Sequence, residues 1–125
     1  MTKAGRDTQV LFTVEGANIA PRFDQAQEVM IIALDDAGKV TDERTVVLPQ
    51  PSAEELCQMI LADGIDVLVC GGIEDQFYEY LTWKKVVVVD SVMGPWTRAL
   101  RRLRADALVP GTVLFDRPAW DRHGL

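Results

Sequence analysis

The stretch that decides the fold reads Val67-Leu68-Val69-Cys70-Gly71-Gly72-Ile73, an apolar run that ends on a thiol and two glycines. A short apolar run with turn signals on both sides is typical of a strand buried on both faces, as in a parallel or mixed sheet covered by helices. The glycines let the backbone turn sharply and approach a ligand without an intervening side chain. Ligands of open α/β sheets usually lie just beyond the carboxyl end of a central strand. We therefore expect a binding loop here.

Three strands without an intervening helix are predicted before this stretch, at residues 9–14, 28–34 and 44–48. Their β-branched and aromatic composition, and the turn at residues 35–39, indicate an antiparallel meander. Between the first two strands, Pro21 fixes one backbone angle, which indicates a shaped loop over residues 19–24.

Helices and strands alternate from Ser52 onward. Ser52 and Glu55 have the spacing of a capping box, and an apolar stripe follows as far as Gly64, which predicts a helix. The strand at residues 66–70 is then expected to pair parallel to the first strand through a right-handed crossover. A second helical stripe, a strand at 86–89 and a helix that starts at Pro95 complete the pattern. The order predicts an α/β fold of the three-layer ribonuclease H-like type with a mixed five-stranded sheet.

The size of the chain favours one domain. It has 125 residues, of which 48% are hydrophobic, and this is enough to bury a core without disulfides or metals. We predict a frayed start at residues 1–8, a single domain at 9–108 and a C-terminal tail at 109–125.

The net charge and the cysteine content limit which binding partners and which cellular compartment we expect for this protein. The net charge is −6, so a broad attraction to nucleic acid or to anionic membranes is not expected. The sequence shows no charged-then-apolar leader and no apolar run of about 20 residues. With two cysteines, Cys57 and Cys70, these features predict a cytoplasmic protein with free thiols.

Three short pieces of the chain share the pattern of a known family. They are Ala-Pro-Arg-Phe-Asp-Gln-Ala at residues 20–26, the stretch at 66–73, and the loop from Ser91 to Gly94 ahead of the last helix. Over roughly residues 9 to 108 the chain resembles the dinitrogenase iron–molybdenum cofactor-binding and biosynthesis domain family. The resemblance implies a domain that carries or helps to assemble a metal–sulfur cluster and has no turnover chemistry of its own.

The resemblance also implies a site formed by the loops after the first, fourth and fifth strands. Many family members have a histidine followed by Phe-Gly in the first loop, and that histidine is implied to be a cluster ligand. Here Arg22 stands at the matching position, and Asp24 takes the place of the glycine. Arginine stays protonated and cannot ligate a metal. The candidate cofactor-binding residues on these loops are Arg22, Cys70, Gly71, Gly72, Ser91, Met93 and Gly94.

Cys70 is the candidate metal ligand. A thiolate at a strand end near a helix N-terminus would have a lowered pKa and would suit soft metals or clusters. The residue is equally consistent with a small buried hydrophobe, since free cysteine is among the most buried residue types. Cys57 lies in a helical stripe and is assigned to packing. Neither cysteine belongs to a C-x-x-C pair, so a self-sufficient zinc or iron–sulfur site is not expected.

An anionic ligand is a second possibility for the same loops. The Arg22 guanidinium and the helix starts after residues 72 and 94 would hold an anionic cluster or an oxyanion. Glu74 and Asp75, in the first turn of one of these helices, would repel it. Arg22 is as consistent with an ion pair to Asp24 or Glu15 that locks the loop. Met93 is either a soft thioether ligand or a core residue.

The last helix and the tail leave further alternatives open. Four arginines on this helix form either a solvated face or a docking surface for an acidic protein partner; they are Arg98, Arg101, Arg102 and Arg104. Residues 113–115 would either add an edge strand or dock on a partner chain. His123 is a lone histidine in the tail and gives poor evidence for a metal.

Three functions are therefore compared. The first is non-catalytic binding, carriage or assembly of an iron/molybdenum–sulfur cluster, and we predict that the protein is not an enzyme. The alternative, prompted by Arg22, is an interaction or regulatory protein that kept the fold and lost the cluster. A metal-dependent nuclease would need carboxylates such as Glu15, Asp24 and Asp90 at strand ends, and it rests on fold analogy alone.

Overall fold

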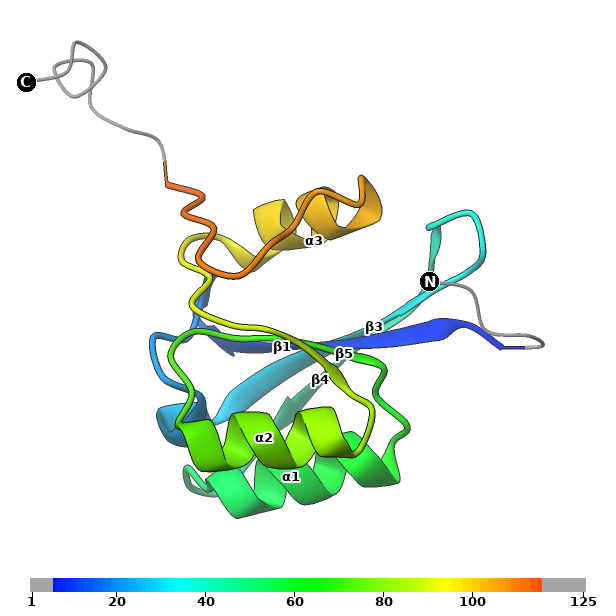
Figure 1. The fold of residues 1–125 in the computed structure, drawn as a ribbon. Coiled ribbons are helices and arrows are strands. Elements are labelled where there is room, and N and C mark those ends of the chain that lie inside the picture. The colour runs from blue at the N-terminus through cyan, green and yellow to red at the C-terminus, as the bar shows by residue number, and fades with distance from the viewer. Residues whose placement is uncertain (1–5, 116–125) are drawn as a thin grey trace, which may run out of the picture.

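The structure, a computed structural model, describes residues 6–115, and within them one mixed sheet of six strands forms the centre of the molecule (Figure 1). Five of the strands lie in the order β4-β3-β1-β5-β6, and β2 pairs with β1 off this path. The β1–β3 and β3–β4 pairs are antiparallel, and the β1–β5 and β5–β6 pairs are parallel. The strands are β1 (Thr8–Glu15), β2 (Asn18–Ile19), β3 (Glu28–Leu34), β4 (Val40–Val47), β5 (Val67–Val69) and β6 (Val87–Val89).

The mixed α/β fold and the parallel pairing of β5 with β1 are confirmed, but two details of the prediction are wrong. The sheet has six strands rather than five, because Asn18–Ile19 turns back and pairs with the end of β1. Two residues are too few to give a periodic signal. In addition, β4 begins at Val40 rather than at Arg44. After the half-buried Val40, residues 41–43 are exposed and polar, so they lack the alternation that marks a half-buried strand.

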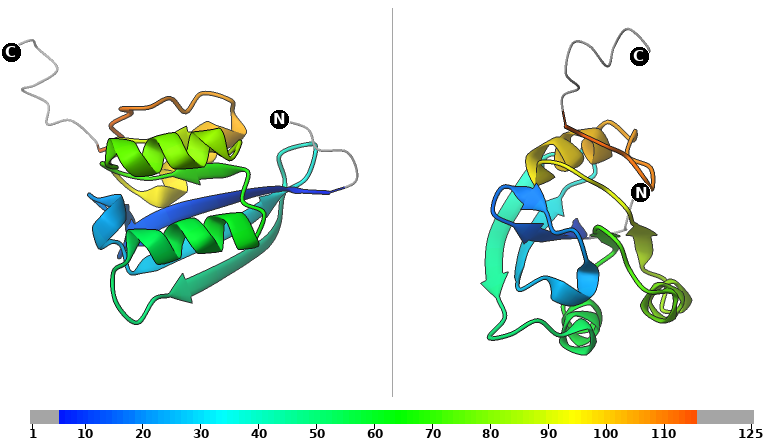
Figure 2. Two further views of the ribbon diagram at one scale, coloured as in Figure 1. Left: turned by 60° about the horizontal axis from the view of Figure 1, so that its bottom comes forward. Right: turned by 90° about the vertical axis from the view of Figure 1, so that its left-hand side faces the viewer.

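The helices lie on both faces of the sheet. Figures 1 and 2 show α1 (Ala53–Ala62) and α2 (Asp75–Trp83) on one face and α3 (Trp96–Arg104) on the other. The N-terminus of α1 is capped as expected, since the Ser52 hydroxyl accepts a hydrogen bond of 3.2 Å from the Glu55 backbone N–H. No helix of the described chain is long and apolar enough to cross a membrane.

The core has two layers because alternate residues of each strand point to opposite faces of the sheet. Leu11, Ile31 and Leu68 pack with the helices α1 and α2, and their strand neighbours Val10 and Ile32 pack on the side of α3; all of them are at most 1% exposed. This arrangement supports a three-layer α/β fold. Assignment to the ribonuclease H-like type stays a prediction.

The described part of the predicted tail packs on the domain. Val113 forms a parallel bridge with Met93, and Leu114 is buried at 6% exposure. The Leu114 backbone N–H donates to the Met93 carbonyl oxygen at 2.8 Å. Residues 109–115 are thus joined to the predicted domain 9–108. The rest of the tail, with His123, and residues 1–5 of the predicted frayed start lie outside the described residues.

Candidate functional site

A pocket of about 350 Å³ lies where β1, β5 and β6 reach their carboxyl ends. Three loops form its walls: the β1–β2 turn with the chain up to Pro21, the loop after β5, and the loop between β6 and α3. The volume is in the range of small-ligand sites, which begins at about 300 Å³. The described lining residues are Glu15, Asn18, Ile19, Pro21, Gly71, Gly72, Ser91, Val92, Met93, Gly94 and Phe115.

The loop after β5 is fixed by a close backbone approach at Gly71. A Cβ atom at Gly71 would lie 2.3 Å from the Ala20 carbonyl oxygen and 2.4 Å from that of Pro21. The next residue continues the contact, since the Gly72 N–H donates to the Pro21 oxygen at 2.8 Å and the Phe23 N–H donates to the Gly72 oxygen at 2.8 Å. The first two loops are therefore held together by backbone hydrogen bonds.

The loop after β6 is tied to both of the others. The Ser91 N–H donates to the Gly71 oxygen at 2.9 Å, and the Ile19 N–H donates to the Gly94 oxygen at 2.8 Å. Gly94 has φ +116°, a conformation that favours glycine. Ser91 has φ +58°, which is uncommon for a residue with a Cβ atom. These contacts preform the pocket.

Five of the seven candidate residues line this pocket, and two do not. The five are Gly71, Gly72, Ser91, Met93 and Gly94, whereas Arg22 and Cys70 are absent from its described lining. Sequence reasoning missed Asn18, and it considered Glu15 only as an ion-pair partner of Arg22 or as a nuclease carboxylate. It also missed Phe115, which reaches the pocket through the pairing of its segment with Met93.

The expectation of a lowered pKa at Cys70 is wrong. The side chain is 0% exposed and belongs to the core cluster between the sheet and the helices α1 and α2. Burial, and secondarily the nearby Asp90 carboxylate, raise the pKa of this thiol well above its ordinary value. At neutral pH it is a protonated core residue, and the helix N-terminus does not offset the loss of solvation.

We expect both thiols to resist alkylation in the folded protein. Burial, with a smaller contribution from Glu54, raises the pKa of Cys57 to about 11, and the pKa of Cys70 is raised further. Only the thiolate reacts, so iodoacetamide at pH 8 should label Cys57 slowly and Cys70 more slowly. Mass spectrometry of peptides measures both rates, and both sites should react rapidly in urea. Faster labelling of folded Cys70 than of Cys57 would contradict this assignment.

Arg22 forms the ion pair with Asp24 that was one of its open alternatives. Its Nε donates to Asp24 Oδ1 at 3.0 Å, and its Nη2 donates to Oδ2 at 3.2 Å. This hydrogen bonding lowers the pKa of Asp24 and raises that of Arg22. Exposed pairs of this kind contribute little to stability. The guanidinium is therefore engaged by Asp24 within the first loop and does not line the described pocket.

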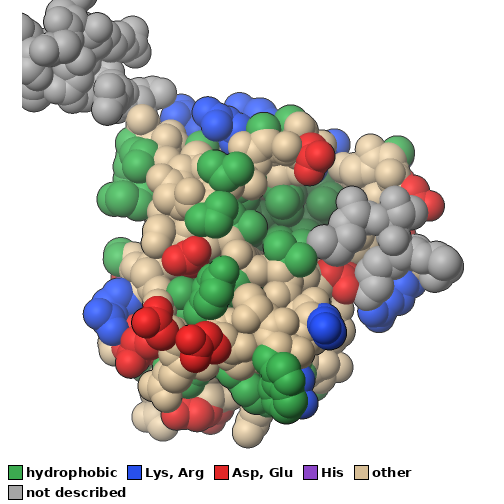
Figure 3. All heavy atoms as spheres, viewed as in Figure 1, with side chains coloured by type: hydrophobic (Ala, Val, Ile, Leu, Met, Phe, Trp, Pro, Cys, Tyr) green, Lys and Arg blue, Asp and Glu red, His purple; other side chains and the backbone are tan. Residues whose placement is uncertain are grey.

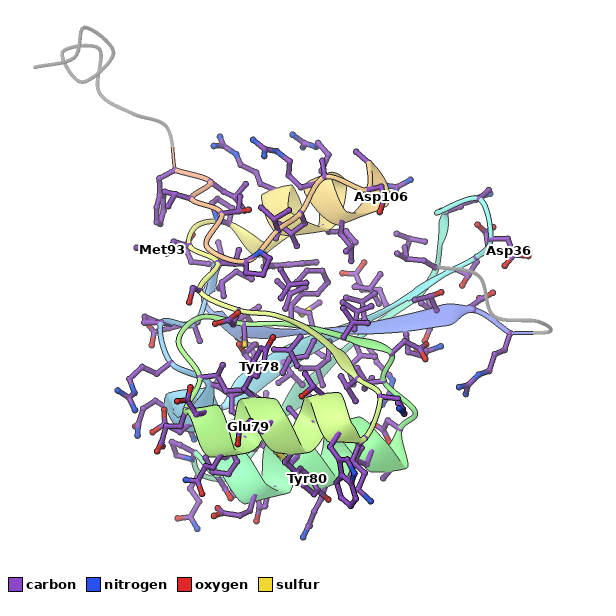
Figure 4. The ribbon with its side chains drawn as sticks, viewed as in Figure 1. Asp36, Tyr78, Glu79, Tyr80, Met93 and Asp106 are labelled. Carbon is purple, nitrogen blue, oxygen red and sulfur yellow. The ribbon has the colours of Figure 1, made fainter. Side chains whose placement is uncertain are left out.

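Met93 is a surface residue, and the core alternative is wrong. Its side chain is 54% exposed, and Figure 4 places it on the loop that leads into α3. Because the pocket includes it, the thioether is a soft group available to a ligand.

The acidic residues of the nuclease hypothesis do not gather into a metal site. Asp24 is paired with Arg22, Asp90 accepts a hydrogen bond of 3.2 Å from the Ser91 hydroxyl, and Glu15 lines the pocket. Over residues 6–115, no group of three or more His, Cys, Asp or Glu side chains could hold a metal ion. The pocket therefore does not offer a multidentate side-chain site for a bare ion.

Basic side chains gather over α3 (Figure 3), but they are not equivalent. Arg98 Nη1 donates to the Leu114 carbonyl oxygen at 2.8 Å, and Arg104 Nε donates to that of Gly38 at 2.7 Å. Arg101 and Arg102 are exposed. Docking of an acidic partner on Arg98, Arg101 and Arg102 stays a prediction.

Several solved structures are similar to this chain. The crystal structure of PH0822 has a TM-score of 0.74 at 18% identity and covers 81% of this chain and 92% of that chain. The NMR structure of MJ0327 from Methanococcus jannaschii, a candidate dinitrogenase, has a TM-score of 0.69 at 16% identity, with coverages of 90% and 97%. The NMR structure of TM1290 from Thermotoga, a candidate NifB protein, has a TM-score of 0.62 at 17% identity, with coverages of 90% and 99%. At such identities the likeness shows the fold.

Two comparisons of the sequence with known proteins gave different results. The search of curated proteins gave no significant match, whereas a family model matches most of the chain. The family model described as dinitrogenase iron–molybdenum cofactor matches residues 9–106. This range contains all three pieces of the predicted resemblance and, among the described lining residues of the pocket, all except Phe115. The family model points to a function related to that cofactor. The chain belongs to the dinitrogenase iron–molybdenum cofactor family.

Proposed function

We propose that this protein binds a preassembled iron–molybdenum–sulfur type cluster as cargo in the loop pocket, and carries it or takes part in its assembly without catalysing a reaction. The observation that carries the proposal is the preformed pocket at the carboxyl ends of β1, β5 and β6, within a chain of this family. Ligands of open α/β sheets usually lie at such an edge.

The groups in the pocket suit an assembled cluster better than a free metal ion. Metals in a preassembled cluster are already bridged by sulfide, so the protein has to supply shape and a few contacts rather than a full ligand set. Gly72 leaves the backbone of the loop without a side chain on the pocket wall, Ser91 offers a hydroxyl, and Met93 offers a soft sulfur.

A second candidate is the interaction or regulatory protein that kept the fold and lost the cluster. Two observations favour it: Cys70 is buried with a raised pKa, and Arg22 is paired with Asp24. Both residues had been the strongest sequence candidates for holding a cluster. The two functions differ in whether the pocket takes up a cluster at all.

Anaerobic loading separates the two candidates. Purified protein incubated with iron, sulfide and molybdate, or with a preassembled cluster, is expected to retain a visible chromophore through gel filtration. Met93→Ala should reduce uptake because it removes the exposed soft donor of the pocket. Cys70→Ala should leave the uptake per folded chain unchanged, since this thiol is enclosed in the core.

The matched control is Met59→Ala, which removes a thioether from the α1 side of the core, away from the pocket. Its uptake should equal that of the wild type. If no chromophore is retained by the wild type, the carrier function is rejected and the interaction candidate takes its place. If Cys70→Ala abolishes uptake in a folded protein, the assignment of the pocket is wrong.

A further inference from the structure

We propose that Glu15 holds the cluster by coordinating a metal at the cluster surface through its carboxylate, and that the same charge keeps free oxyanions such as molybdate out of the pocket. The inference rests on the proposed function and names the charged contact of that site. Among the described lining residues, Glu15 is the only one with an acidic or basic side chain. The charge of the described pocket wall is therefore negative.

The position of Glu15 is set by the tight turn that joins β1 to β2. Glu15 pairs with Asn18 across this turn. The turn is fastened to the start of α3, because the Trp96 N–H donates to the Ala17 oxygen at 3.0 Å and Asn18 forms a bridge with Pro95. Figure 1 shows both segments at the same end of the sheet, the turn in blue and the loop before α3 in yellow. Backbone contacts therefore join the wall that carries Glu15 to the loop that carries the exposed thioether.

The Glu15 carboxylate is open to a ligand. Glu15 is exposed, and within residues 6–115 no hydrogen bond or ion pair engages its side chain. The other charged groups of these loops are used elsewhere: Arg22 donates two hydrogen bonds to Asp24, and Asp90 accepts one from the Ser91 hydroxyl. Glu15 is thus a carboxylate that lines the described pocket and has its oxygens free for a metal.

A carboxylate in this place distinguishes between two forms of molybdenum. A cluster presents metal ions at its surface, and iron accepts carboxylate oxygen as a ligand. Because Met93 lines the same pocket, a hard oxygen and a soft sulfur are offered together. A free oxyanion presents only oxygen atoms, and the described wall, with one carboxylate and no Lys, Arg or His side chain, repels it. We therefore expect uptake of the cluster and no uptake of molybdate alone.

The cluster affinity of a Glu15 variant tests the proposal. Glu15→Gln keeps the shape of the side chain and removes its charge. It should raise the dissociation constant of a preassembled iron–molybdenum–sulfur cluster by at least about tenfold. The matched control is Glu43→Gln, which makes the same change in net charge on β4, at the far edge of the sheet. This control should bind the cluster as the wild type does.

A second readout separates coordination from a structural role. The electron paramagnetic resonance spectrum of the bound cluster should differ between the wild type and Glu15→Gln, because only a metal ligand changes the electronic surroundings of the metal. The spectrum of Glu43→Gln should match that of the wild type. Circular dichroism confirms that each variant is folded. Sodium molybdate alone, added to the wild type in a calorimeter, should give no binding.

Four results would overturn the proposal. Equal cluster binding and equal spectra for folded Glu15→Gln and wild type would show that the carboxylate is not a ligand, and tighter binding by Glu15→Gln would show that it repels the cluster. Binding of molybdate alone to the wild type would show that the pocket does not exclude oxyanions. These three results leave the proposed function standing, since the wild type still takes up the cluster. If the wild type retains no cluster, the proposed function is rejected and this role of Glu15 is rejected with it.

Discussion

Gly71→Ala is expected to destabilise the protein by about 3 kcal/mol or more. The added Cβ atom would lie 2.3 Å and 2.4 Å from the carbonyl oxygens of Ala20 and Pro21. Both atoms belong to the backbone, so no side-chain rotation can relieve the clash, and the first two loops of the pocket must separate. The free energy of unfolding in urea measures the loss, and the variant should also retain less cluster per chain.

Gly72→Ala is the matched control for this prediction. Its Cβ atom would meet only the Pro21 carbonyl oxygen at 3.5 Å, an ordinary van der Waals contact. The stability change should stay below about 1 kcal/mol. Equal effects of the two substitutions would show that the close approach at Gly71 does not hold the loops together.

Phe23→Ala is expected to cost about 3–5 kcal/mol of unfolding free energy. The ring is 0% exposed, belongs to the core on the α1–α2 side, and packs against the ring of Phe77 with centroids 6.2 Å apart. It anchors the short 3₁₀ helix Phe23–Gln25 that follows the pocket-lining Pro21. Removing it should leave a cavity and loosen the first loop, which hydrogen exchange at residues 19–25 would detect.

Phe115→Ala provides the comparison for the core prediction. Phe115 is 49% exposed, so the same truncation should change the free energy of unfolding by less than about 1 kcal/mol. If Phe23→Ala were as mild as Phe115→Ala, the first loop would not depend on its core anchor.

The sequence predicted best those features that depend on a few neighbouring residues. The α1 cap at Ser52 and the glycines after β5 could be predicted because capping and sharp turns need particular residue types at fixed positions. The side of the sheet on which Cys70 is buried could also be predicted, from the alternation of residues along the strand. In the run 67–70, Leu68 and Cys70 alternate onto the α1–α2 side, while Val67 and Val69 face the other side.

The remaining features depend on contacts between distant parts of the chain. Phe115 reaches the pocket because residue 113 pairs with residue 93, and no local pattern encodes that pairing. Arg22 could be predicted to pair with a neighbour, but the choice of Asp24 over Glu15 depends on the path of the first loop. β2 is held by its register against β1 rather than by its own two residues.

Binding of a cluster in the loop pocket can be located by titrating ¹⁵N-labelled protein with a preassembled iron–molybdenum–sulfur cluster under anaerobic conditions and following each residue in NMR spectra. We expect the amide signals of Gly71, Gly72 and residues 91–94 to shift or broaden first, together with those of Asn18 and Ile19. Signals of β4, at the far edge of the sheet, should stay unchanged. If the protein is saturated without any change at these loops, or if the changes centre elsewhere, the cluster does not bind in this pocket.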